Sequence, residues 1–98
     1  MAKHRVSDAP VTYKSVSTAT VTIGLAANFR RKFWAIYNET GSDVYYVASK
    51  TAPTDSNGMV LLADGDSVED SGFDVAVSTI YLLQSSGGTL NVKIVEGA

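Results

Sequence analysis

Short runs that alternate between apolar and polar residues follow one another along most of the chain. In the clearest run, residues 19–25, the apolar side chains Val21, Ile23 and Leu25 fall on one face of an extended strand. Turn-forming Gly, Asn, Asp and Ser residues separate these runs, and no window sustains the period of a helix. The pattern predicts an all-β chain of short antiparallel strands.

Two aromatic runs predict the centre of the fold. Residues 31–38 and 43–48 are apolar on both faces, which is typical of strands covered on each side. The turn-forming residues 39–42 lie between them, so the two runs are expected to form an antiparallel hairpin.

The length of 98 residues fits one domain. For residues 17–98 the sequence predicts a single small antiparallel β-sandwich or barrel, jelly-roll-like, of about seven to nine short strands. Residues 1–16 are polar and basic, with only three alternating apolar residues. They are expected to form an extended N-terminal arm that adds to a partner's sheet edge, so deleting them should spare the fold.

Charge is divided unevenly along the chain. The net charge is −2, but residues 1–32 hold six basic residues against one aspartate, and residues 33–98 hold two basic residues against nine acidic ones. This polarity suits head-to-tail contacts between copies, or a basic arm that reaches an acidic neighbour; solvated charge on a basic tail and acidic loops is the alternative. The candidate partner-binding residues are Lys3, Arg5, Val11, Tyr13, Lys14, Arg30 and Arg31.

The residues needed for common catalytic chemistry are scarce. The chain has no cysteine and a single histidine, His4, which argues against Ser-His and Cys-His catalysis and excludes thiolate metal sites. Residues 64–74 hold five carboxylates, but their spacing does not match a calcium-binding loop. We interpret them as turn residues, with an interfacial cation as the alternative. No catalytic residue, metal site or cofactor is predicted, and no enzyme activity.

Nucleic acid and membrane partners are not expected either. The basic residues 30–32 precede Phe33 and Trp34, a combination found on single-strand nucleic-acid platforms, but the two rings fall on opposite faces of one strand. No apolar run approaches the length of a transmembrane helix, and residues 1–5 lead into no signal core, so synthesis in the cytoplasm is expected.

The order of segments from Phe29 onward resembles small virion accessory proteins of tailed bacteriophages. The segments that carry the resemblance are residues 30–38 (RRKFWAIYN), 43–47 (DVYYV), 57–61 (NGMVL), 64–67 (DGDS), 80–82 (IYL) and 86–96 (SGGTLNVKIVE). The resemblance implies a capsid decoration, cement or tail-associated protein, made in the bacterial host cytoplasm and located in the virion in many copies. It carries over no catalytic residue.

The expected function is therefore to bind other protein surfaces. The expected partners are the major capsid protein or another virion protein and further copies of the chain, with no small-molecule ligand. A tail or fibre adhesion module that binds a host carbohydrate or protein is the alternative. An exposed Trp34 near residues 55–57 would favour adhesion, and a buried Trp34 would favour the cement protein.

Overall fold

The computed structural model describes residues 11–17, 20–72, 75–84 and 89–97. These residues form strands and no helix, which confirms an all-β chain of antiparallel sheets. None of the described residues belongs to a helix that could cross a membrane. The strands are β1 (Val11–Ser17), β2 (Thr22–Leu25), β3 (Phe33–Tyr37), β4 (Val44–Ser49), β5 (Val60–Leu62), β6 (Ser67–Ser71), β7 (Thr79–Gln84) and β8 (Thr89–Gly97).

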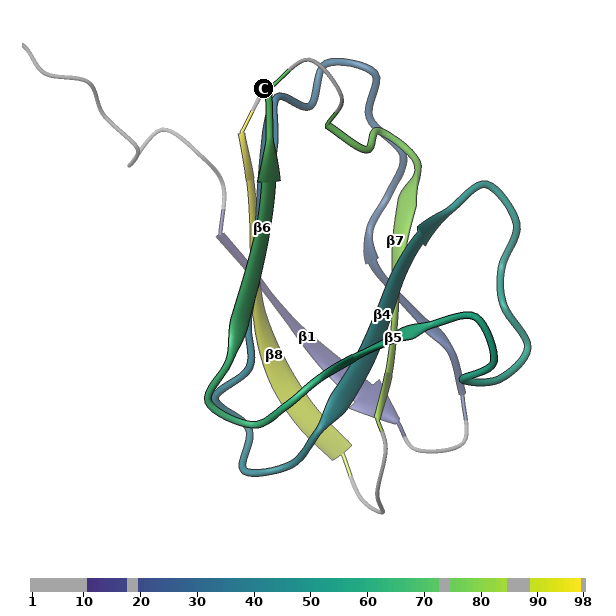
Figure 1. Cartoon of the computed structure of the whole chain (residues 1–98), viewed down its shortest axis with the longest axis vertical. Coiled ribbons are helices and arrows are strands. Elements are labelled where there is room, and N and C mark those ends of the chain that lie inside the picture. Colours follow the sequence, from purple (N-terminus) through teal and green to yellow (C-terminus); the bar gives the residue numbers. More distant parts are fainter. Residues whose placement is uncertain (1–10, 18–19, 73–74, 85–88, 98) are drawn as a thin grey trace, which may run out of the picture.

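The strands form two four-stranded sheets that face each other (Figure 1). Sheet A has the order β1-β8-β3-β6, and sheet B has the order β2-β7-β4-β5. Four of the pairs are nested: β1 with β8, β2 with β7, β3 with β6 and β4 with β5. The chain is thus paired like one long hairpin whose bend lies between β4 and β5, and the pairs β3·β8 and β4·β7 join the halves of each sheet.

One apolar core fills the space between the sheets. Its buried residues come from both sheets: Leu25, Trp34, Ile36, Val44, Leu62, Ile80, Leu82, Val92 and Ile94. Trp34 of sheet A is 4% exposed and meets Tyr46 of sheet B edge to face, with ring centroids 6.1 Å apart. The expectation that β3 is a central strand is confirmed, since it lies between β8 and β6 and its residues Trp34, Ala35 and Ile36 are buried.

The expected hairpin between residues 31–38 and 43–48 is wrong. Both runs form strands, but β3 lies in sheet A and β4 in sheet B. Crossing between the sheets lets the apolar side chains of both strands face one core, whereas a hairpin would have placed them side by side in one sheet. The signal for a strand is local, but the choice of sheet depends on partners that are distant in sequence.

Strand β2 departs from the predicted alternation at Gly24. Ile23 pairs with Tyr81 and Leu25 with Ile80, so Gly24 is an extra residue that forms a β-bulge. Ile23 was expected to face the core but is 48% exposed, while Gly24 is buried. A Cβ at Gly24 would lie 3.0 Å from Leu82 Cδ1 and 3.1 Å from Ile94 Cδ1, so a larger residue here would require these two side chains to shift by a few tenths of an ångström.

The expected arm of residues 1–16 differs from the structure over residues 11–16. These residues lie in β1, which pairs with β8 in an unbroken register from Val11 opposite Val95 to Ser17 opposite Thr89. The reason is that β8 offers a free edge within the same chain, so the segment's backbone groups are satisfied without a partner molecule. Residues 1–10 lie outside the described part of the chain.

Candidate interaction surfaces

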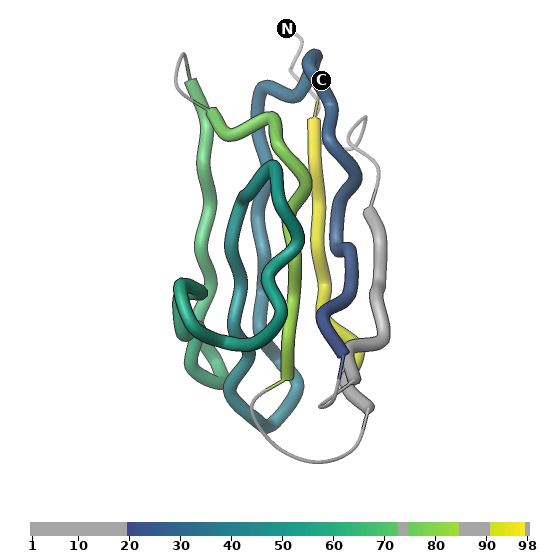
Figure 2. Tube along the Cα trace, turned by 90° about the vertical axis from the view of Figure 1, so that its right-hand side faces the viewer, coloured from purple at the N-terminus to yellow at the C-terminus, as the bar shows by residue number. Residues whose placement is uncertain are grey.

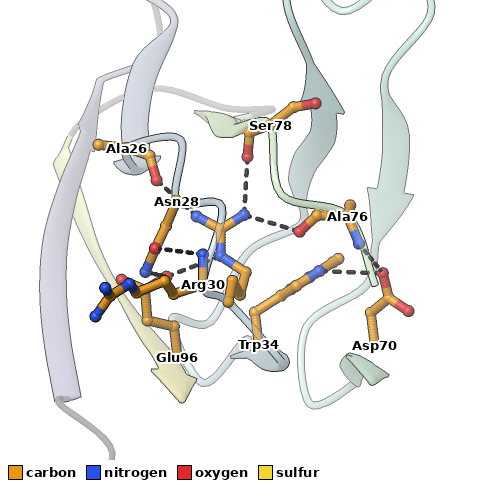
Figure 3. A network of polar contacts seen from close by, with 9 residues as sticks. Ala26, Asn28, Arg30, Trp34, Asp70, Ala76, Ser78 and Glu96 are labelled. Carbon is orange, nitrogen blue, oxygen red and sulfur yellow. Dashed lines mark hydrogen bonds and ion pairs between the residues drawn. The ribbon is translucent and has the colours of Figure 1, made fainter. Parts of the chain in front are cut away.

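A buried arginine organises one end of the molecule. The Arg31 side chain is fully buried, and its Nε donates to Glu96 Oε2 at 2.8 Å. Its Nη1 donates to the carbonyl oxygens of Ala76 (2.9 Å) and Ser78 (2.8 Å), and its Nη2 to that of Ala26 (2.6 Å) (Figure 3). The guanidinium therefore ties together the loop before β3, the segment before β7 and the end of β8.

This burial corrects the assignment of Arg31 to partner binding. An arginine enclosed by three carbonyls and a carboxylate has no donor directed at solvent, so it holds the fold together instead. Arg30, the neighbouring candidate, is exposed and remains available to a partner.

The loop of residues 26–32 is held in place by further hydrogen bonds. The backbone N–H of Asn28 donates to Val77 O at 2.9 Å, and the side-chain Oδ1 of Asn28 accepts the backbone N–H of Arg30 at 2.9 Å. At the end of the loop, the Lys32 amide N–H donates to Gly97 O at 2.8 Å. The loop therefore presents the side chains between these anchors in a fixed position.

The most exposed large apolar side chain of the described residues is presented by this loop. Phe29 is 95% exposed, and it borders two hollows. The larger, about 510 Å³, is lined by Phe29, Arg30, Arg31, Lys32, Gly72, Val75 and Val77. The smaller, about 270 Å³, is lined by Ala27, Phe29, Lys50, Val77, Ser78 and Thr79. We call Phe29, Arg30, Lys32 and Lys50 the Phe29 end; its three charged side chains are exposed and basic.

A buried asparagine organises the opposite end of β3. Asn38 is 0% exposed, and its Nδ2 donates to the carbonyl oxygens of Ser42 and Leu62, each at 2.9 Å. Its backbone N–H donates to Asp66 O at 2.9 Å, and its backbone carbonyl accepts the Gly65 N–H at 2.7 Å. The loops 38–43 and 63–66 are thereby fastened to each other.

These two loops carry an acidic surface. We call Glu39, Asp43, Asp64 and Asp66 the acidic end; Glu39, Asp64 and Asp66 are exposed, and neither loop contains lysine or arginine. Asp64 Oδ1 accepts the Gly41 N–H at 2.8 Å, and Asp43 Oδ1 accepts the Asp64 N–H at 3.1 Å. Gly65 has a φ of 87°, the left-handed conformation that favours glycine in such a turn.

The acidic segment 64–74 does not gather in one place. Asp70 lies away from the acidic end. Its Oδ2 accepts the Trp34 Nε1–H at 3.2 Å and the Ala76 backbone N–H at 3.0 Å. Asp74 lies outside the described residues. Within the described part of the chain, no group of three or more His, Cys, Asp or Glu side chains could hold a metal ion.

The outer face of sheet B forms another surface. Cross-strand pairs place Ile23, Tyr81 and Val47 in one row, and Leu83, Tyr45 and Leu61 in the next. Ile23 and Leu61 are about half exposed, at 48% and 51%, and the three residues Tyr45, Val47 and Tyr81 are half-buried. The loop of residues 50–59 projects on this side of the molecule (Figure 2). The strand residues of this face include no charged side chain among those described.

The other predicted partner-binding residues come from the N-terminal part of the chain. Lys3 and Arg5 lie outside the described residues, and Val11, Tyr13 and Lys14 stand in β1. Sequence reasoning missed Phe29 and Asn38 as organisers of surfaces. The available signal was their position, because Phe29 precedes the strand run 31–38 and Asn38 is its last residue, next to the turn-forming residues 39–42.

Comparisons with known proteins add no relative. No protein-family model, curated protein or solved structure matches the chain.

Proposed function

We propose that the chain is a non-enzymatic structural protein of a phage virion, a capsid decoration or cement protein that binds the major capsid protein shell and neighbouring copies of itself. The observation that carries the proposal is the uncharged outer face of sheet B, with its two tyrosines and half-exposed Ile23 and Leu61. Interface cores are depleted in charge and enriched in aromatic residues.

The strand pairing supports the same proposal. Nested pairing of eight strands into two four-stranded sheets corresponds to a jelly roll, a double-sheet arrangement of two Greek keys. Viral capsid domains use this arrangement, but lectins also do, so the topology alone does not choose between the cement protein and the adhesion module.

The surroundings of the aromatic residues favour the cement protein. The adhesion alternative needs an exposed aromatic ring beside carboxylates or amides, and Trp34 is 4% exposed in the core. Phe29 is exposed, but the charged side chains that border its hollows are arginine and lysine. A carboxylate beside a ring can accept hydrogen bonds from sugar hydroxyls. Arginine and lysine side chains have no acceptor atoms and cannot do so.

The test is co-sedimentation of the purified chain with shells of the encoding phage assembled without it. We expect saturable binding that Leu61→Glu weakens at least tenfold, because the substitution places a charge on the proposed contact face. Leu61 is 51% exposed on an edge strand, so the variant should keep its fold. Ser67→Glu is the matched control, since it adds the same charge at an exposed position on an edge strand of sheet A.

Two results would contradict the proposal. Wild-type chain that stays in the supernatant at every shell concentration would exclude capsid binding, and binding to host-cell polysaccharide in a parallel pull-down would then assign the adhesion function. Equal binding by the Leu61 and Ser67 variants would remove sheet B as the contact face.

A further inference from the structure

The two ends of the molecule carry opposite charge. Strand β3 runs from the Phe29 end to the acidic end, because Arg31 stands just before the strand and Asn38 just after it. The Phe29 end presents Arg30, Lys32 and Lys50, and the acidic end presents Glu39, Asp64 and Asp66. The named surface charges at the two ends of β3 are therefore opposite in sign.

Hydrogen bonds hold the backbone at both ends. Arg31 holds the loop that presents Phe29, and Asn38 holds the two acidic loops against each other. A contact between such preformed loops orders little further backbone, so its cost in conformational entropy falls mainly on the exposed side chains.

We propose that copies of the chain associate head to tail, with the Phe29 end of one copy against the acidic end of the next. The turn at residues 63–66 of one copy faces the larger hollow of the next, where Arg30 and Lys32 meet its carboxylates and Phe29 is covered. The contact joins two different surfaces, so it leaves a free end on each copy and builds a ring or a filament.

A second copy fits this contact better than another acidic partner. The chain itself supplies both complementary surfaces at opposite ends of the same strand, and repetition of one contact covers both of them. Salt screens the attraction between the charged side chains of this contact, whereas it does not screen the hydrophobic contribution from burying Phe29. The proposal concerns the chain alone and does not rest on binding to a shell.

The test uses two variants of the full chain, each with one damaged end. Phe29→Ser with Arg30→Glu damages the Phe29 end, and Glu39→Lys with Asp66→Lys damages the acidic end. These side chains are exposed in the monomer, so both variants should keep the wild-type melting temperature. In sedimentation velocity we expect wild-type chain to form concentration-dependent oligomers and each variant alone to associate at least tenfold more weakly.

An equimolar mixture of the two variants gives the decisive result. Each retains the end that the other has lost, so the mixture should form one-to-one dimers and stop there. Glu69→Lys is the control for added positive charge, because Glu69 is exposed in the middle of sheet A's edge strand β6, and it should associate like wild type. Doubling the salt concentration should weaken wild-type association.

Three outcomes overturn the proposal. The first is wild-type chain that remains monomeric up to millimolar concentration. The second is unchanged association of either damaged variant, which would place the contact elsewhere. The third is a mixture that stays monomeric.

Replacement variants are available if one pair of substitutions lowers the melting temperature. Arg30→Gln or Glu39→Gln then replaces that pair, and we expect a smaller loss of association in the same direction. No shell is present, so these results leave shell binding to its own test, while a monomeric chain would remove binding to neighbouring copies from the proposed function.

Discussion

Two buried polar side chains, Arg31 and Asn38, frame the central strand β3. Each donates to backbone carbonyl oxygens that are distant in sequence, Arg31 to Ala76 and Ser78 and Asn38 to Leu62. Burying such groups is costly unless their hydrogen bonds are made, and here backbone carbonyl oxygens accept those bonds. At the residue scale, these two side chains convert the ends of the sheets into defined surfaces.

Replacing Arg31 should destabilise the fold strongly. Arg31→Met keeps much of the side-chain volume but removes the donor to three loop carbonyls and leaves Glu96 Oε2 with the weaker bond from Asn28 Nδ2 at 3.4 Å. Removing one partner of a buried ion pair costs about 3 to 5 kcal/mol, and we expect the lower part of this range because the Glu96 side chain is 20% exposed. Urea unfolding of the wild-type chain and of the variant measures this difference in the free energy of unfolding.

The adjacent arginine provides the control for this substitution. Arg30→Met changes the same residue type at an exposed position, and its effect on the free energy of unfolding should stay within about 0.5 kcal/mol. Equal effects of the two substitutions would show that the guanidinium of Arg31 does not hold the loops together.

At the scale of elements, β1 is the strand for which the structure differs most from the prediction made from the sequence. It is an edge strand of sheet A, and its only strand neighbour within that sheet is β8. Because β1 is paired along its full length within the chain, residues 11–17 serve the fold rather than a free arm.

Truncations should locate this boundary. A chain that begins at Val11 keeps every position of the β1·β8 register, whereas a chain that begins at Thr18 loses all of them and exposes the edge of β8. We expect the longer truncation to lower the melting temperature by more than about 10 °C, since a loss of 1 kcal/mol shifts it by about 4 to 8 °C in a domain of this size. Amide exchange in residues 91–95 should also rise.

The truncation that begins at Val11 is the matched comparison for this experiment. If both truncations melt at the wild-type temperature, then β1 contributes nothing to stability and residues 1–16 act as an arm after all.

At the scale of the whole molecule, nested pairing makes most contacts long-range. Only β4 and β5 are consecutive strands that pair with each other among the described elements, and the outermost pair, β1 with β8, joins segments near the two ends of the chain. Closing such distant contacts costs chain entropy before burial compensates for it.

Refolding should therefore be slow for a domain of this length. We expect a time constant of roughly milliseconds to seconds, as for other all-β domains dominated by non-local pairs. Stopped-flow fluorescence can follow Trp34, the single tryptophan, whose ring contacts Tyr46 of the opposite sheet. A microsecond phase that accounts for the whole fluorescence change would contradict a folding step limited by long-range pairing.

The sequence by itself determined where most strands lie and which residues many of them bury. The alternation of residues 89–94 places Val92 and Ile94 on one strand face, and both are buried in the structure. An apolar run on both faces predicted β3 as a central strand, which it is. These signals are local, because the side chains of a strand alternate between its two faces.

Only the tertiary structure decided the partners of each strand and the role of each charged residue. Residues 33–37 and 44–49 look like a hairpin in the sequence, yet they lie in opposite sheets because their pairing depends on β8 and β7. Arg30 and Arg31 are adjacent and chemically identical, but Arg31 alone meets carbonyls from residues 26, 76 and 78 and becomes buried. Those carbonyl oxygens come together only when the two sheets pack against each other, so no local sequence pattern predicts the burial of Arg31.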